Sequence, residues 1–295
     1  MRTEKGGSRL DINWFPGHMA KTLRELKAYL KMVDLVIETC DARIPESSRN
    51  PELQQLLGNK PRILVLNKAD LADHAVTGTW IDRYRQQGIT AIACNSLHKT
   101  GLKELEKACQ DLMREKTERL MAKGRINVPI RGMVVGIPNT GKSTLINGLC
   151  RRKIAKTADR PGVTRQISWM KTAGRLELLD SPGILWPQLG DRHTKLLLAA
   201  TGAIKDELLP VEDVAVALME LLLKLVPDLV CQRYKLETVD LSAPVVEILA
   251  QAARTRGCLL PGDKLDIYRF ATLFIDELRA GKIGRITLEQ PPEIQ

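Results

Sequence analysis

The chain has 295 residues, of which 44% are hydrophobic and 27% charged, and its formal net charge is +10. This balance is typical of a soluble globular protein of one or two domains, and no apolar run approaches the ~18 residues of a membrane span. The N-terminal sequence MRTEKGGSRLDINWF lacks the apolar core of a signal peptide, so we expect a cytoplasmic protein with no membrane partner.

The first two thirds of the chain alternate apolar runs of strand length with amphipathic segments of helical spacing. We predict helices at 17–32, 51–57, 77–88 and 101–124, and strands at 33–43, 61–71 and 89–96. The pattern continues with a strand, glycine loop and helix at 131–150 and a strand pair at 167–172 and 176–183. This alternation predicts an α/β fold, a mostly parallel sheet with helices on both faces.

The pattern changes at about Thr194, after a predicted linker at 184–194. Leucine- and alanine-rich segments of helical spacing follow at 194–206, 212–225, 243–256 and 263–280, and no strand signal of similar strength is present. We therefore predict two domains, an α/β domain over residues 1–190 and a small all-helical domain over residues 191–295.

A phosphate-binding loop is the strongest motif. The segment Gly136-Ile-Pro-Asn-Thr-Gly141-Lys142-Ser143 matches G-x-x-x-x-G-K-[ST] between an apolar strand and a helix, which is the context the motif requires. Its glycines let backbone N–H groups surround phosphates. Lys142 is expected to reach the β- and γ-phosphates and Ser143 to bind magnesium. The predicted contacts are Asn139, Thr140, Gly141, Lys142, Ser143 and Thr144.

The segment Asn67-Lys68-Ala69-Asp70 indicates which base is bound. The Asp70 carboxylate can accept the guanine N1–H and N2–H together, a donor pair that adenine lacks, while Asn67 can contact another base edge and the Lys68 stem can lie along the ring. Asn95-Ser96-Leu97, at the end of the third strand, can support the base through backbone N–H groups. The predicted ligands are GTP and GDP.

A second group of residues is predicted to hold magnesium and sense the γ-phosphate. Asp180-Ser-Pro-Gly183 ends a strand, where the carboxylate can hold magnesium through water and the Gly183 N–H can meet the γ-phosphate. Thr164 lies between the phosphate loop and Asp180, the place of a magnesium-binding threonine in a nucleotide-sensing loop. Magnesium is thus assigned to Ser143, Thr164 and Asp180.

The motif order is unusual, because the guanine segment precedes the phosphate loop. Such an order is permissible since these loops share one sheet edge, so a permutation moves the chain ends and not the site. The order and the segments WFPGHMAK (14–21), DARIP (41–45), GIPN (136–139), PGVT (161–164) and DSPG (180–183) resemble the ribosome biogenesis GTPase A (YlqF) family of circularly permuted P-loop GTPases.

This resemblance implies a factor that acts late in assembly of the large ribosomal subunit and binds its rRNA. Because the DSPG loop leads directly into the C-terminal domain through 184–194, we expect GTP to favour rRNA binding and hydrolysis to release the factor. The resemblance also implies a helical RNA-contacting C-terminal domain, and we expect a monomer away from the ribosome and no DNA partner. Residues 1–200 carry 34 Lys and Arg against 20 Asp and Glu, whereas residues 201–295 carry 11 against 15. The positive excess suits a polyanion, although a basic surface without a dedicated partner explains it equally.

The RNA surface is predicted chiefly at 151–175. Its basic residues are Arg151, Arg152, Lys153, Lys156, Arg160, Arg165, Lys171 and Arg175. A local basic face of the C-terminal domain is a further candidate, formed by Arg254, Arg256, Lys264 and Arg269.

Hydrolysis is predicted to be slow in isolation and stimulated by ribosomal subunits. Ile184 follows the DSPG segment, where Ras-like enzymes carry a water-orienting glutamine. The resemblance points to His18 as the residue that orients or deprotonates the water, with Lys142 and Thr164 as the other catalytic candidates. His18 can also serve as a cap, a packing group or an RNA contact. Asn139 resembles the asparagine of GTPases that bind potassium beside the phosphates.

Two other functions remain open. A regulatory GTPase with a protein partner is the main alternative, although the C-terminal sequence EQPPEIQ contains no prenylation motif. A GTP-dependent RNA-modifying enzyme would need its own catalytic residues, and the C-terminal third shows no metal cluster or nucleophile–base pattern.

Overall fold

The computed structural model describes residues 19–150, 169–172, 174–186, 189–236, 240 and 243–292, with the side chains of 19–22 left out. His18, Thr164 and the basic residues between 151 and 168 lie outside this range. The chain divides into two compact units. The sheet unit contains the described residues from 19 to 186 together with 289–292, and the helical unit contains those from 189 to 288.

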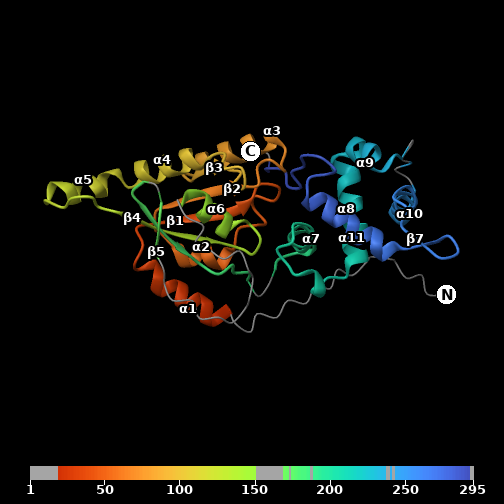
Figure 1. The fold of residues 1–295 in the computed structure, drawn as a ribbon, viewed down its shortest axis with the longest axis horizontal. Helices are drawn as coiled ribbons and strands as arrows, with labels where there is room; N and C mark the ends of the chain where they lie inside the picture. The colour runs from red at the N-terminus through yellow and green to blue at the C-terminus, as the bar shows by residue number, and fades with distance from the viewer. Residues whose placement is uncertain are drawn as a thin grey trace. The chain divides into compact units, whose positions relative to one another are not determined.

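One six-stranded sheet forms the centre of the sheet unit. Its strands are β1 (Leu35–Asp41), β2 (Arg62–Asn67), β3 (Thr90–Ala93), β4 (Ile130–Gly136), β5 (Trp169–Lys171) and β6 (Leu176–Asp180). Their order across the sheet is β3-β2-β1-β4-β6-β5. Neighbouring strands run parallel, except that β5 is antiparallel to β6. The predicted mostly parallel sheet is confirmed (Figure 1).

Helices cover both faces of this sheet. They are α1 (Met19–Leu30), α2 (Pro51–Leu57), α3 (His74–Gln86), α4 (Leu102–Leu112) and α6 (Lys142–Leu149), and a further helix, α5 (Arg114–Ala122), follows α4. Successive side chains of a strand point to opposite faces. Ile63 therefore joins a core with Leu105 of α4 and Leu145 of α6, whereas Leu64 packs with Trp80 of α3.

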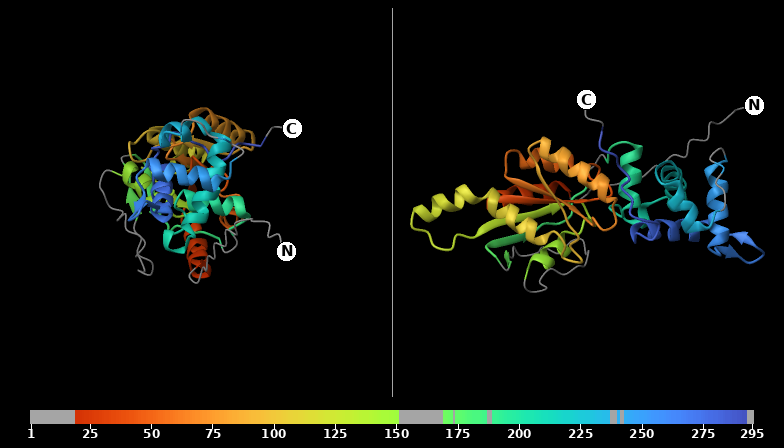
Figure 2. Two further views of the ribbon diagram at one scale, coloured as in Figure 1. Left: turned by 90° about the vertical axis from the view of Figure 1, so that its right-hand side faces the viewer. Right: turned by 90° about the horizontal axis from the view of Figure 1, so that it is seen from above.

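Two helices replace the single one predicted over 101–124. The chain leaves the helical conformation at Met113, where φ is −101° and ψ is 9°. Met113 is the last buried apolar residue of this stretch, and α5 buries none of its residues. Because packing on the sheet ends at Met113, nothing requires α5 to continue the line of α4. Figures 1 and 2 show α5 extending past the sheet.

The sheet order places a binding crevice between β1 and β4. From β1 the chain moves outward to β2 and β3, and it then crosses to the other side of β1 to form β4. Open α/β sheets bind ligands outside the carboxyl ends of strands at such a reversal. Asp41, Asn67 and Gly136 end β1, β2 and β4, so these three strands deliver their following loops to the same edge.

The segment 289–292, here called the return segment, belongs to the sheet unit. Trp80 of α3 donates its indole Nε1–H to the Glu289 carbonyl oxygen at 3.0 Å. The Glu289 carboxylate accepts the N–H of Glu46 at 2.9 Å and of the next residue at 3.0 Å. The sequence-based prediction places residues 191–295 as a whole in the second domain, whereas residues 289–292 belong to the sheet unit. These contacts are long-range, and no local pattern marks them.

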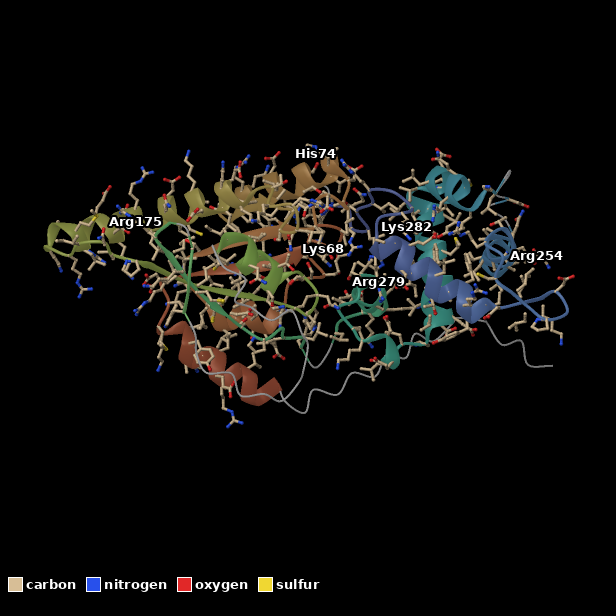
Figure 3. All side chains as sticks on the ribbon, viewed as in Figure 1. Lys68, His74, Arg175, Arg254, Arg279 and Lys282 are labelled. Atoms are coloured by element: carbon tan, nitrogen blue, oxygen red, sulfur yellow. The ribbon has the colours of Figure 1, made fainter. Side chains whose placement is uncertain are left out.

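The helical unit contains α7 (Arg192–Ala200), a 3-10 turn (Asp206–Leu208), α8 (Val211–Leu225), α9 (Pro227–Tyr234), α10 (Val245–Thr255) and α11 (Ile267–Arg279). A short hairpin, β7 (Leu259–Leu260) with β8 (Lys264–Leu265), is added to the expected helices. Arg279 of α11, labelled in Figure 3, donates to the Ala199 carbonyl at 2.9 Å and pairs with Asp206 at 2.7 Å. No helix among the described residues is long and apolar enough to cross a membrane.

A buried carboxylate joins three helices of this unit. Glu277 of α11 accepts from Arg233 Nε and the Tyr234 hydroxyl of α9, both at 3.0 Å. It also accepts from Arg256 Nη2, just past α10, at 2.7 Å. Burial alone raises the pKa of Glu277, but hydrogen bonds from Arg233 and Tyr234 outweigh this and leave the pKa below its ordinary value.

Candidate nucleotide-binding site

The phosphate loop joins β4 to α6 and requires two of its glycines. Gly136 has φ +150° and Gly141 has φ +89°. A Cβ at Gly136 would lie 2.5 Å from the Thr39 carbonyl oxygen, and one at Gly141 would lie 2.2 Å from Asn67 Nδ2. Side chains are excluded at both positions. The helix begins at Lys142, so its first backbone N–H groups face the loop, the arrangement that binds anions.

Side chains of the loop are fixed from within the protein. The Lys142 ammonium is buried and donates to the Ile137 carbonyl at 2.7 Å. The Thr140 hydroxyl donates to the same carbonyl at 3.0 Å and lies 2.8 Å from the Thr39 hydroxyl. Because Thr140 points into the sheet, we expect its contact with a nucleotide to come from its main chain.

Asn67 joins three of the predicted segments. Its Nδ2 donates to the Thr140 carbonyl at 2.7 Å. Its Oδ1 accepts from the Ser96 N–H at 3.1 Å and from the Ser96 hydroxyl at 2.7 Å. The sequence predicted a base contact for this side chain, whereas in the structure its oxygen and one N–H hold the guanine segment to the phosphate loop. Any base contact of Asn67 therefore falls to the second amide N–H.

The remaining base-binding candidates surround this junction. Lys68, labelled in Figure 3, follows β2 in the left-handed region with φ +59°, and Asp70 is exposed. Asn95 is buried and accepts the His98 N–H at 3.0 Å, which shapes the turn after β3. Leu97 is 75% exposed on this turn, so its side chain adds no packing to the site.

Two of the three predicted magnesium ligands meet. The Ser143 hydroxyl donates to Asp180 Oδ2 at 3.4 Å, which places two hard oxygen donors of the type that magnesium prefers at one point. The glycine of the DSPG segment closes over the loop, since a Cβ at Gly183 would lie 2.9 Å from Lys142 Nζ. Ile184 is buried and donates its N–H to the Gly136 carbonyl at 3.2 Å.

Sequence reasoning missed two residues that brace this site. Thr39 of β1 bonds to the Val135 carbonyl at 3.1 Å as well as to the phosphate loop. Asn50 donates to the Ile184 carbonyl at 3.0 Å and caps α2 by accepting the Glu52 N–H at 2.9 Å. The available signal was their place in the buried strand that neighbours the phosphate-loop strand, or in the loop that follows it.

Chain order distinguishes this site from that of most nucleotide-binding folds, because the guanine segment at 67–70 comes before the phosphate loop at 136–143. Both reach one sheet edge, so fold and site together define a circularly permuted P-loop GTPase. Residues 131–245 match the family model described as 50S ribosome-binding GTPase. Over 282 residues the chain is 46% identical to ribosome biogenesis GTPase A of Bacillus cereus, covering 96% of this chain and 95% of that one. The chain belongs to the ribosome biogenesis GTPase A family.

Other similarities extend across kingdoms and to solved structures. Mitochondrial ribosome-associated GTPase 1 of Mus musculus is 40% identical over 211 residues, which cover 68% of this chain and 64% of that protein. The crystal structure of GNP-bound YlqF from Thermotoga maritima matches with a TM-score of 0.64 and 27% identity, covering 93% of this chain and 100% of that one. A GDP-bound YlqF structure gives a TM-score of 0.65 at 26% identity, covering 92% and 100%.

Proposed function

We propose that this GTPase is an assembly factor for the large ribosomal subunit, that it binds rRNA in its GTP-bound state and that hydrolysis releases it. Family membership supports the ribosomal part, since relatives across this family are named for ribosome biogenesis. The observation that carries the nucleotide part is the bonding of Asn67 to Thr140 and Ser96, because it joins the guanine segment to the phosphate loop.

Each segment has a separate task in the proposed site. Asp70 accepts the paired guanine donors, and the Lys68 stem lies along the base. Backbone N–H groups from Asn139 to Thr144 surround the phosphates, and Lys142 neutralises their charge. Ser143, Asp180 and Thr164 hold magnesium, which would offset phosphate charge when bound. Thr164 enters this assignment on sequence alone.

Slow turnover by the isolated protein follows from the residue after Gly183. Ile184 is 4% exposed and its side chain has no polar atom, so it cannot orient a water. We assign that task to His18, completed when the factor meets its subunit, and we assign a potassium ion to Asn139. Asn139 has φ +59° at the bend of the phosphate loop, where added positive charge would assist transfer.

The contacts of Gly183 and Ile184 can couple the presence of the γ-phosphate to the segment that leads into the helical unit. Gly183 closes over Lys142, and Ile184 bonds to Gly136 and to Asn50. The described part of the sheet unit ends only a few residues later, at 186. A γ-phosphate that draws in the Gly183 N–H therefore acts on the segment leading to the helical unit, and its loss relaxes that segment.

The proposed RNA surface comprises the basic stretch 151–175 and the basic residues around α10 and α11. Of the first group, Lys171 and Arg175 are described, and both are exposed. Arg256 is engaged with Glu277, so Arg254, Lys264 and Arg269 are the better candidates in the helical unit. Each phosphate contact should add to the salt dependence of subunit binding.

The test is GTP turnover with and without purified large ribosomal subunits in potassium buffer. We expect subunits to accelerate turnover and to co-sediment with the protein in a non-hydrolysable GTP analogue but not in GDP. Unchanged turnover together with no co-sedimentation would contradict the ribosomal proposal and would favour a regulatory GTPase with another partner.

Replacing potassium by sodium should slow turnover, and equal rates would remove the potassium assignment.

A pair of glycine variants separates nucleotide binding from general damage. Gly141→Ala should weaken GTP binding by about 100-fold, because its Cβ collides with Asn67 at a positive φ. Gly78→Ala is the matched control, since a Cβ there meets nothing within 4 Å. Normal GTP affinity in Gly141→Ala would contradict the proposed phosphate site.

A further inference from the structure

The carboxylate that ends β1 is surrounded by donors although the proposed site gives it no task. Asp41 accepts from Arg43 Nε at 2.9 Å, from Arg43 Nη2 at 2.8 Å and from the Arg43 backbone N–H at 3.1 Å. Lys68 Nζ lies 3.0 Å from Asp41 Oδ2. The Asp41 side chain is 3% exposed and the Arg43 side chain 2%. Two ionised residues are therefore buried beside Lys68 of the guanine segment.

Retention of both charges is explained by the geometry. Burial alone would raise the pKa of Asp41, but the charges of Arg43 and Lys68 outweigh it and hold the pKa well below its ordinary range. The bidentate arrangement is the strongest that arginine and carboxylate form. The Asp41 carboxylate is thus an anion held in a fixed position at the sheet edge where the base is proposed to bind.

Lys68 does not need this partner for its own burial. Its side chain is 26% exposed, so water could solvate the ammonium, and Arg43 already satisfies both oxygens of Asp41. The contact instead ties the ends of β1 and β2. A free lysine side chain has about 2 kcal/mol of rotamer entropy, which binding to a base would have to remove. A lysine held in advance binds with less entropic loss.

We propose that Asp41, held in place by Arg43, is a positioning residue for guanine recognition, which fixes the Lys68 ammonium so that the lysine stem is ready to cover the base. This inference rests on the proposed guanine site. The β1 terminus thereby orders the lysine of the guanine segment.

The experiment measures GDP affinity of the full chain by fluorescence of a labelled GDP. Asp41→Asn should weaken GDP by about tenfold, the size expected for loss of a charge-assisted hydrogen bond. Competition by inorganic tripolyphosphate, which has no base, should be unchanged. Asp82→Asn is the matched control, because Asp82 pairs with Arg85 on the exposed face of α3, and it should leave GDP affinity unaltered.

A double-mutant cycle tests whether Asp41 acts through Lys68. Lys68→Met should weaken GDP by a similar factor, and adding Asp41→Asn to it should change affinity by less than about twofold. Additive losses would overturn the proposal, as would equal loss of GDP and tripolyphosphate in Asp41→Asn. If thermal denaturation shows that Asp41→Asn does not fold, Asp41→Glu, which keeps the charge but displaces the carboxylate from Lys68, takes its place and should weaken GDP while leaving tripolyphosphate unchanged; unchanged GDP affinity in it would reject the positioning role.

Failure of the proposed function is distinguishable from failure of this inference. If the wild-type chain binds ADP as well as GDP, the guanine site itself is wrong. If the wild type prefers GDP and Asp41→Asn retains both its affinity and its preference, only the positioning role is lost.

Discussion

Each unit of the chain holds a buried carboxylate surrounded by cations, and the two groups differ in what they connect. Asp41 joins the end of one strand to Lys68 at the end of the next. Glu277 joins α11 to α9 and to Arg256 past α10. The first group lies at the edge where loops meet a ligand, whereas the second lies among packed helices. The same chemistry therefore orders a binding segment in one unit and fixes helix packing in the other.

The largest effect expected from this comparison is on Glu277. Glu277→Ala leaves two guanidinium groups and a phenol without their shared acceptor, which should destabilise the helical unit by about 3–5 kcal/mol. Hydrogen exchange across α8 and α11 would measure it, and GDP affinity should not change. Glu220→Ala is the control, because that exposed pair with Lys224 contributes at most about 0.5 kcal/mol. A matching loss of GDP binding would contradict the division of tasks.

An intermediate effect comes from removing one arginine of each group. Arg43→Met leaves buried Asp41 with Lys68 as its main cation and should cost about 2–3 kcal/mol in the sheet unit. Arg233→Met leaves Glu277 with Arg256 and Tyr234 and should cost about 1–2 kcal/mol. Chemical denaturation of each variant gives both values. A larger loss of stability in Arg233→Met than in Arg43→Met would show that the number of hydrogen-bond partners left to the carboxylate does not decide the loss.

The smallest effect is a dependence on pH. Glu277 has a folded pKa below its ordinary 4.5, so its contribution to stability is complete above 4.5 and is lost as pH falls through the folded pKa. The free energy of unfolding of the helical unit, measured by hydrogen exchange after correction for the intrinsic exchange rate, should therefore fall below pH 4.5, and Glu277→Gln should lose less of it on acidification. An equal acid loss in the variant would assign it to other carboxylates.

Local motifs were enough to predict the mostly parallel sheet, the helices that cover it and the chain order of the nucleotide segments. The phosphate loop carries its own signature, since its glycines and Lys142 are adjacent in sequence. Contacts between distant residues were not predictable in this way. The link of Asp41 to Lys68 and the two-sided bonding of Asn67 depend on the register of neighbouring strands, which no single segment encodes.

Local reasoning also failed where packing decides the outcome. The break at Met113 follows from the end of the sheet beneath the helix, and a window centred on 101–124 shows only continuous helix formers. The helix α9 lies in the gap between the predicted helical segments 212–225 and 243–256, and it begins at Pro227, since proline is well suited to the first turn of a helix.

The return segment changes how this protein should be dissected. The helical unit is inserted between two points of the sheet unit, whose described residues end at 186 and resume at 289. A fragment that stops at residue 190 would strip the Trp80 indole of its acceptor and the N–H of Glu46 of its carboxylate. To obtain a minimal GTPase, residues 189–288 should instead be removed and the cut ends joined by a flexible spacer. Residues 289–292 should be kept after that spacer.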